Sequence, residues 1–162
     1  VTVTLKDGSE VFIRPIEIDD TQLCLEMFNS LSPDTIYDRY FIFRSTLSYE
    51  EAAKMTCISY ADEVALVALV EDKGETKMIA DARIYIHGDK GEIGVVVQDD
   101  WQNKGLGTFL VRELVQEGRC RGLRNLSIYC LPDNVVMKHV AQKVGFRLKT
   151  SDVGIITLDI DL

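Results

Sequence analysis

A glycine-rich loop between an apolar strand and an amphipathic helix most restricts what this chain can fold into. The β-branched run at residues 93–97 predicts a strand, and residues 108–115 show helical spacing. The loop between them reads Gln-Asn-Lys-Gly-Leu-Gly from Gln102 to Gly107. Glycines let the backbone approach a ligand closely, and the free N–H groups and dipole of a first helical turn attract an anion. The loop therefore predicts a site for a phosphate-bearing ligand.

Spacing excludes two other phosphate-binding motifs. The dinucleotide fingerprint needs a third small residue three places after Gly107, where this chain has Leu110. It also needs an acidic residue about 20 positions further on, where Asn125 and Ser127 stand. A P-loop needs a lysine directly after its glycine, whereas Lys104 precedes the glycine here. What remains is Gln-x-x-Gly-x-Gly following a strand.

A second segment, residues 134–146, follows after a strand expected at residues 126–130. Asn134 is a good N-cap residue and Gly145 a good residue for ending a helix, with an apolar stripe between them. In this order, the two segments resemble the acyl-CoA-binding segments of the GNAT superfamily of N-acetyltransferases. The resemblance covers roughly residues 64–162.

The resemblance implies that the chain binds acetyl-CoA, releases CoA as product and needs no metal. The pyrophosphate would lie on the glycine loop, and the pantetheine arm would pair with a strand that is splayed from its neighbour. The residues expected at the cofactor are Val95, Val96, Val97, Gln102, Asn103, Lys104, Gly105, Leu106, Gly107, Thr108 and Asn134.

Glu92 is the candidate general base. Because a lysine ammonium has a pKa of ~10.4, few amines are neutral at pH 7, and a base assists the attack on the thioester. Glu92 begins the strand that leads to the glycine loop, and the resemblance favours this role. The other interpretation is an exposed charge at a strand end after a glycine turn.

The segment at residues 31–41 resembles the bacterial protein-lysine acetyltransferases. Many small-amine acetyltransferases have a tyrosine four residues before the glycine of their Gly-Phe pair, where this chain has Ala141. The resemblance implies a protein acceptor with an exposed lysine, for example an acyl-CoA synthetase, and a fused regulatory domain. Two alternatives stay open: a small-amine or amino-acid acetyltransferase, and a module that senses acyl-CoA without turnover.

Several other residues have both a chemical and a structural interpretation. Tyr37, Tyr40 and Phe41 could line an acceptor groove, but aromatic residues at helical spacing are more often core. Cys130 ends a strand beside the expected cleft, yet no base stands near it in the sequence. The two histidines have no third metal ligand nearby in the sequence.

Composition limits the remaining possibilities. The 162 residues suggest a single domain, and the strand-like pattern already at Val1 suggests that it was excised from a longer multidomain chain. No run approaches the ~18 apolar residues of a membrane span. A net charge of −8 argues against nucleic acid and anionic membranes as partners. Four cysteines without metal or disulfide spacing suit the cytoplasm.

The order of the expected elements predicts the fold class. A hairpin at residues 1–15 precedes three helices at about residues 20–30, 33–41 and 49–58. Strands at residues 64–70, 77–86 and 92–97 lead to the glycine loop, and the two cofactor segments are followed by strands at residues 146–149 and 155–160. We expect a GNAT-like α/β fold with a mixed, mostly antiparallel central sheet and helices on both faces. The ligand should lie between the two strand ends that precede Gly105 and Asn134.

Overall fold

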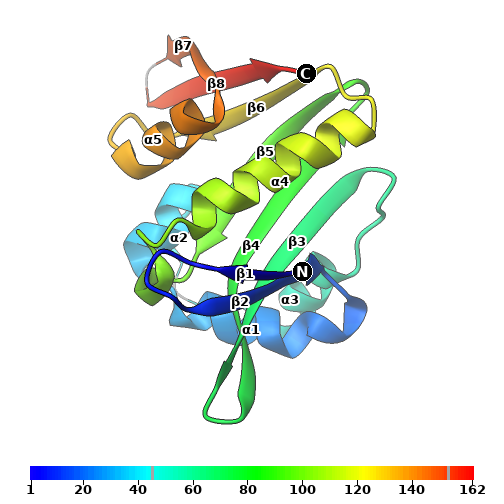
Figure 1. The fold of residues 1–162 in the computed structure, drawn as a ribbon, viewed down its shortest axis with the longest axis vertical. Helices are drawn as coiled ribbons and strands as arrows, with labels where there is room; N and C mark the ends of the chain where they lie inside the picture. Colours follow the sequence, from blue (N-terminus) through cyan, green and yellow to red (C-terminus); the bar gives the residue numbers. More distant parts are fainter. Residues whose placement is uncertain (45, 153) are drawn as a thin grey trace.

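One mixed sheet organises the chain. The computed structural model describes residues 1–44, 46–152 and 154–162, and these form an eight-stranded sheet in the order β1-β2-β3-β4-β5-β6-β8-β7. The strands are β1 (Thr2–Thr4), β2 (Glu10–Pro15), β3 (Glu63–Asp72), β4 (Glu75–His87), β5 (Lys90–Val97), β6 (Asn125–Cys130), β7 (Arg147–Asp152) and β8 (Ile155–Asp161). Neighbouring strands are antiparallel except β5 and β6, which are parallel. The long hairpin of β3 and β4 projects beyond the rest of the sheet (Figure 1).

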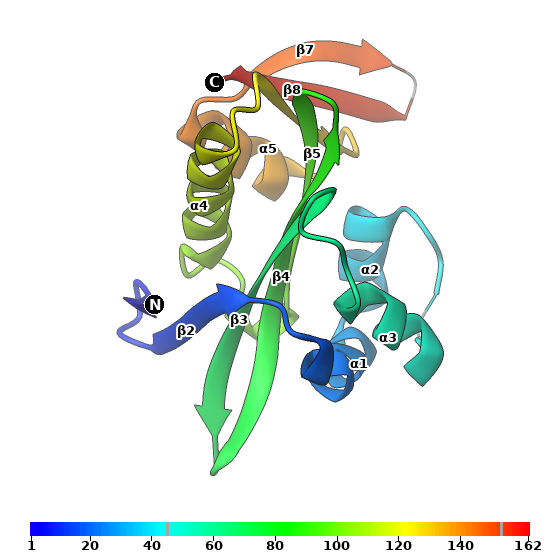
Figure 2. The same cartoon turned by 90° about the vertical axis from the view of Figure 1, so that its right-hand side faces the viewer.

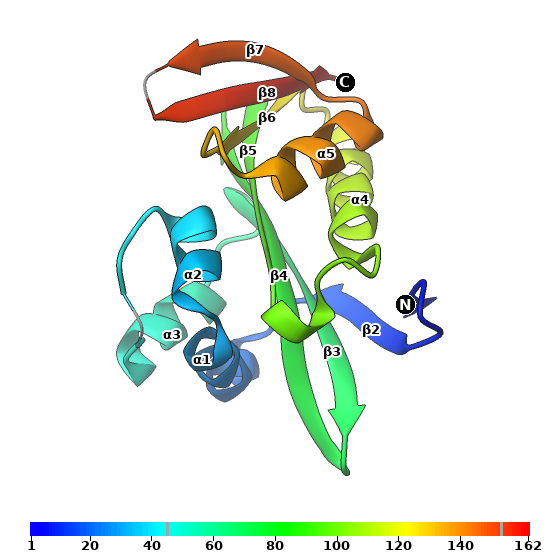
Figure 3. The ribbon, with the colours of Figure 1, turned by 90° about the vertical axis from the view of Figure 1, so that its left-hand side faces the viewer.

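Helices cover both faces of this sheet, which confirms the expected fold class. They are α1 (Thr21–Ser30), α2 (Pro33–Tyr40), α3 (Tyr49–Thr56), α4 (Leu106–Cys120) and α5 (Val135–Val144), with short 3-10 turns η1 (Ile18–Asp20) and η2 (Asp99–Trp101). Figure 2 shows α4 and α5 on one face and α1, α2 and α3 on the other, and Figure 3 shows the same layers from the opposite side. Within the described residues, no helix is both long and apolar enough to cross a membrane.

Each face has its own apolar core, because alternate residues of a strand point to opposite faces. Under α4 and α5, Leu110 and Leu114 pack with Ile84 and Leu126 of the sheet. Under α1, α2 and α3, the core includes Ile36 and other fully or nearly buried residues. Central strands β3 and β4 are therefore buried along most of their length, and the buried part of β4 includes the charged residues Asp81 and Arg83.

Local capping explains where several helices begin. The Ser32 side chain accepts a hydrogen bond from the Thr35 amide at the start of α2, and Pro33 occupies the first helical position. Ser48 and Glu51 form the expected capping box of α3, and the Asn134 side chain accepts the Met137 amide in α5. The starts of α2, α3 and α5 therefore lie where their capping residues predicted them.

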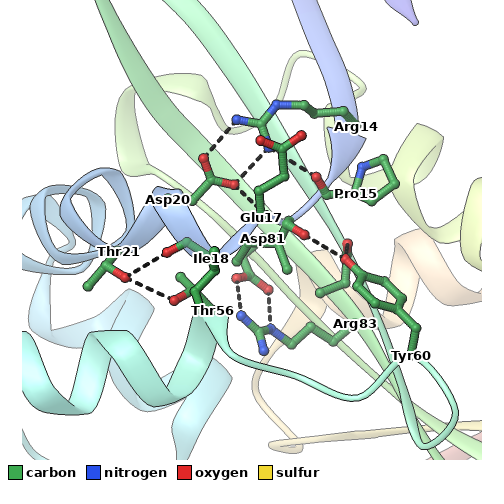
Figure 4. Close-up of polar contacts among 12 residues, drawn as sticks. Arg14, Pro15, Glu17, Ile18, Asp20, Thr21, Thr56, Tyr60, Asp81 and Arg83 are labelled. Carbon is green, nitrogen blue, oxygen red and sulfur yellow. Dashed lines mark hydrogen bonds and ion pairs between the residues drawn. The ribbon is translucent and has the colours of Figure 1, made fainter.

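At the start of α1 the structure corrects the expected use of the cap residue. Asp20 occupies the N-cap position, but its carboxylate accepts both Arg14 Nη atoms at 2.7 Å and the Glu17 amide, not an amide of α1. Burial opposes the charge, yet these hydrogen bonds hold the pKa of Asp20 below its ordinary value. Figure 4 shows this contact beside the buried bidentate pair of Asp81 and Arg83. The Arg14–Asp20 pair links β2 to η1 just before α1, whereas the Asp81–Arg83 pair lies within β4.

Candidate active site

The parallel strands β5 and β6 separate in the middle of the sheet. Their pairing runs from Lys90 opposite Asn125 to Ile93 opposite Ile128, and there it ends. Beyond it β5 stays paired with β4 as far as Val97, while β6 continues along β8 to Cys130. The strands therefore separate at Gly94, and a cavity of about 610 Å³ lies along the opening.

The glycine loop closes one end of this cavity at the start of α4. Gly105 is the N-cap residue with φ +90°, a conformation that glycine adopts without strain, and no side chain of the described residues caps this helix. The first-turn N–H groups of an α-helix have no partner within the helix, and they carry the positive end of its dipole. Lys6 lies against Gly105 and also lines the cavity. This end of the cavity is suited to an anion.

Most of the residues expected at the ligand line this cavity. They are Glu92, Val95, Val96, Val97, Gln102, Asn103, Gly105, Gly107, Thr108 and Asn134. Lys104 and Leu106 are not in the lining. Lys104 Nζ lies 2.7 Å from Asp7 Oδ2 and 5.0 Å from the Trp101 ring, and Leu106 is buried in the core under α4. The cavity thus joins the two strand ends that precede Gly105 and Asn134.

The Gln102 side chain holds the loop in place. Its Nε2 donates to the Val97 carbonyl at 2.9 Å and to Thr35 Oγ1 at 3.2 Å. In η2, Asp99 accepts hydrogen bonds from the Ser32 amide and the Thr35 hydroxyl. The glycine loop is therefore tied to the start of α2, across the sheet from α4.

Glu92 lies at the other end of the opening. It is half-buried in β5, two residues before the strands separate, and it lines the cavity. Its partners in the sheet register are Tyr85 on β4 and Ser127 on β6, so all three side chains point to the face covered by α2. A carboxylate therefore stands beside the point where an acceptor could reach the opening from that face.

The sequence reasoning missed several cavity residues on α2. Asp38 and Arg39 line the cavity together with Tyr85 and Tyr129. Partial burial and then the nearby carboxylates of Asp133 and Asp34 raise the pKa of Asp38. A signal did exist, because Arg39 follows the buried Ile36 by three positions and so shares its side of the helix.

The structure also shows which of the residues with two interpretations line the cavity and which do not. Phe41 lines the cavity, whereas Tyr37 stacks on Phe43 with ring centroids 4.4 Å apart and Tyr40 packs against Phe28 in the core under α1. Cys130 is buried outside the lining, and burial raises its pKa. His139 lines the cavity. Within the described residues, no three His, Cys, Asp or Glu side chains are grouped as metal ligands would be.

Known proteins resemble this chain over most of its length. The family model described as the Acetyltransferase (GNAT) family matches residues 25–146. Acetyltransferase PA5475 of Pseudomonas aeruginosa is 30% identical over 148 residues, which cover 88% of this chain and 78% of the relative. Glucosamine 6-phosphate N-acetyltransferase 1 of Oryza sativa subsp. japonica is 30% identical over 159 residues, covering 92% and 88% of the two chains.

Two proteins named Pat are also similar. Acetyltransferase Pat of Mycolicibacterium smegmatis is 25% identical over 169 residues, which cover all of this chain and 49% of the relative, so this chain spans about half of that protein. The crystal structure of the GNAT domain of S. lividans PAT superimposes with a TM-score of 0.90 and 28% identity, over 100% of this chain and 96% of that one.

Proposed function

This chain belongs to the GNAT family of acetyltransferases, and we propose that it transfers acetyl from acetyl-CoA to the ε-amine of a lysine on a protein. The proposal rests mainly on the separation of β5 from β6. That opening gives a cavity with an uncapped helix start, suited to an anion, at one end and a carboxylate, Glu92, at the other. Donor and acceptor could then meet at the point of separation.

We propose that acetyl-CoA enters with its pyrophosphate on the loop from Gln102 to Thr108. The free amides at the start of α4 and the nearby Lys6 support this placement. The pantetheine arm would follow Val95 to Val97, where β5 has no strand on its β6 side. Backbone N–H groups there would polarise the thioester carbonyl. Asn134 would contribute from the start of α5. Lys104 pairs with Asp7 outside the cavity lining, so it would act on the pyrophosphate only through longer-range charge.

Gly107 offers a direct test of this placement. A Cβ there would meet no atom within 4 Å apart from its chain neighbours and its own helix backbone, so the fold has room for the start of a side chain. Gly107→Glu should therefore fold normally, yet put a carboxylate where the pyrophosphate would lie. We expect CoA affinity, measured by calorimetry, to fall more than tenfold, or about 1.4 kcal/mol. Gln116→Glu adds the same charge further along α4 and should leave the affinity unchanged. Equal affinity in Gly107→Glu and wild type would contradict the placement.

We propose that Glu92 is the general base. It would take the proton from the acceptor amine directly or through a water molecule, and the amine would attack the thioester without a covalent enzyme intermediate. Its position on the α2 side of the opening, opposite the helices that carry the loop, supports this role. The two substrates would then approach from opposite faces of the sheet.

A protein lysine is the proposed acceptor for two reasons. The segment at residues 31–41 resembles the bacterial protein-lysine acetyltransferases, and the whole domain is similar to the GNAT domain of S. lividans PAT. The carboxylates of Asp34, Asp38 and Asp133 also lie near one another beside the cavity, where they would attract an ammonium group. On the same resemblance we include an acyl-CoA synthetase among the acceptors, a fused regulatory domain and a cytoplasmic location.

The second candidate is a small-amine acetyltransferase. The similarity to glucosamine 6-phosphate N-acetyltransferase 1, at 30% identity, favours it. Incubation with acetyl-CoA and a cytosolic lysate, followed by acetyl-lysine mass spectrometry and an assay of released CoA thiol, separates the possibilities. Acetylated protein lysines support the first candidate. CoA release only with small amines supports the second, and CoA binding without release under any condition would indicate a sensor.

A further inference from the structure

Arg39 occupies the point where β5 and β6 separate. Gly94 is the first β5 residue beyond the last β5–β6 pair, and the Arg39 guanidinium lies against it. A Cβ on Gly94 would be 2.4 Å from Arg39 Cζ and 2.5 Å from Nη2, far closer than atoms pack. Glycine at position 94 thus makes room for a guanidinium on the floor of the cavity.

The Arg39 cation has unused hydrogen-bonding capacity. Nη2 donates to Tyr85 Oη at 3.0 Å, while Nε is buried and has no partner among the described residues. No ion pair of the described chain includes Arg39, whose neighbours are the rings of Tyr40 and Tyr85. Burial opposes the charge, but the two tyrosines and Asp81 raise the pKa of Arg39, so the group stays protonated. A guanidinium has five N–H donors, and buried donors are normally satisfied.

The charge and the position of the Arg39 guanidinium together indicate a role for its free N–H donors. Glu92 and Gly94 are two residues apart on β5, so Glu92 and the Arg39 guanidinium share one face of the strand. Attack of a neutral amine on a thioester separates charge, leaving positive charge on nitrogen and negative charge on the carbonyl oxygen. We propose that Arg39 stabilises this oxyanion while Glu92 accepts the proton from nitrogen. The inference rests on the proposed function, and it adds a side-chain cation to the backbone N–H groups.

The acceptor ammonium first gives one proton to Glu92, which passes it to bulk water and returns to the carboxylate. The neutral amine nitrogen then forms a bond to the carbonyl carbon, and the C=O π pair moves to the oxygen, facing Arg39. Glu92 takes a proton from the nitrogen. The oxygen pair then re-forms the C=O bond, the C–S bond breaks, and its electron pair leaves on sulfur. The proton on Glu92 passes through water to the CoA thiolate, which gives N-acetyl-lysine and CoA thiol and restores the carboxylate.

The test compares Arg39→Met, Arg39→Lys and Arg39→Ala with wild type. Kinetics would use acetyl-CoA and a protein acceptor, and calorimetry would give CoA affinity. Loss of one oxyanion donor typically costs ~10²–10³-fold in kcat, so we expect that loss in Arg39→Met with KM and CoA affinity nearly unchanged. Arg39→Lys should lose less, and millimolar guanidinium should partly restore Arg39→Ala. Arg124→Met removes a guanidinium that is 84% exposed beside the turn between β4 and β5, outside the cavity lining, and it should behave as wild type.

Other outcomes separate the possibilities. A kcat within threefold of wild type in both Arg39→Met and Arg39→Lys would overturn the inference. A loss confined to KM or CoA affinity, with no rescue by guanidinium, would show that Arg39 only positions α2. If wild type prefers succinyl-CoA and only that donor responds to Arg39→Met, the cation binds an acyl carboxylate instead. Should Arg39→Met fail to fold, the Lys variant and the rescue decide. A wild-type protein that acetylates no acceptor contradicts the proposed function, and this inference with it.

Discussion

At the scale of single residues, Glu92 and Arg39 give the opening a carboxylate and a guanidinium on one face of β5. The carboxylate is easiest to test by an isosteric change. Glu92→Gln keeps the shape but cannot accept a proton, so we expect transfer at pH 7 to slow by roughly 10²–10⁴-fold with CoA affinity retained. The variant's rate should rise toward pH 10, because the acceptor amine then loses its proton unaided.

Stopped-time assays of CoA release across pH would measure this effect. Glu113→Gln makes the same change on the exposed side of α4 and should match wild type at every pH. Glu92 would be excluded as the base if its Gln variant turned over at the wild-type rate at pH 7.

The sequence predicted the position of single residues well where that position follows from the local backbone. The glycines of the loop and Asn134 were found beside the cavity, since strand, turn and cap chemistry are local. Lys104 was expected at the pyrophosphate, but its ammonium pairs with Asp7 of the β1–β2 turn, 97 positions away in the chain. Arg39 has a local signal, its helical spacing from the buried Ile36, but its contact with Gly94 on β5 joins residues far apart in the chain. Helical periodicity can place Arg39 on the buried side of α2, and it does not show which strand residue the guanidinium meets.

At the scale of elements, Asp99 fastens α2 to the loop that follows β5. Its carboxylate accepts the Ser32 amide at 2.9 Å and Thr35 Oγ1 at 3.0 Å. Asp99→Ala leaves both donors without this partner, so we expect the free energy of unfolding to fall by about 1–3 kcal/mol. Denaturant titration measures the change, and hydrogen exchange should show faster opening in α2. Asp100→Ala removes the neighbouring exposed carboxylate and should have little effect.

The effect of Asp99 should depend on pH in a defined direction. Partial burial opposes its charge, but the bonds from Ser32 and Thr35 hold its pKa below the ordinary value. A lowered folded-state pKa stabilises the fold above the unfolded pKa, about 4, and that stabilisation is lost as pH falls through the folded value. The difference in free energy of unfolding between wild type and Asp99→Ala should therefore become smaller below pH 4. A difference that stays constant from pH 7 to 3 would contradict a role for the ionised carboxylate.

The ends of helices and strands could be predicted from the sequence where they depend on residues close by in the chain. The starts of α2, α3 and α5 follow from Ser32, Ser48 and Asn134, and all three were confirmed. The hairpin of β3 and β4 is longer than its apolar runs, because the polar residues Glu63, Glu71 and Asp72 at the ends of β3 also pair with β4. The position of β8 between β6 and β7 could not be foreseen, because strand order depends on pairing across the whole sheet.

At the scale of the molecule, the two layers of helices create two approaches to one opening. The loop and α4 approach it from one face, and α2 from the other (Figure 3). The chain carries a net charge of −8; Asp34 and Asp38 lie on α2, and Asp133, in the turn before α5, is close enough to raise the pKa of Asp38. Charge and layering together support the proposal that a cationic acceptor arrives from the α2 face and that an anionic donor binds at the start of α4.

The last prediction concerns the acceptor that such a molecule selects. Long-range attraction speeds encounter with a basic surface around a lysine, and salt screens it with a Debye length of about 10 Å at 0.1 M. For a protein acceptor, we therefore expect kcat/KM to fall as salt rises from low concentration, and Asp34→Asn combined with Asp133→Asn to flatten that dependence. CoA affinity should be the same in the double variant and wild type. The kcat/KM values should be compared across a panel of acceptors: lysine, spermidine, aminoglycosides, glucosamine 6-phosphate and purified acyl-CoA synthetases. A free amine with tenfold higher kcat/KM than every protein would overturn the protein-lysine assignment and leave the acetyltransferase family in place.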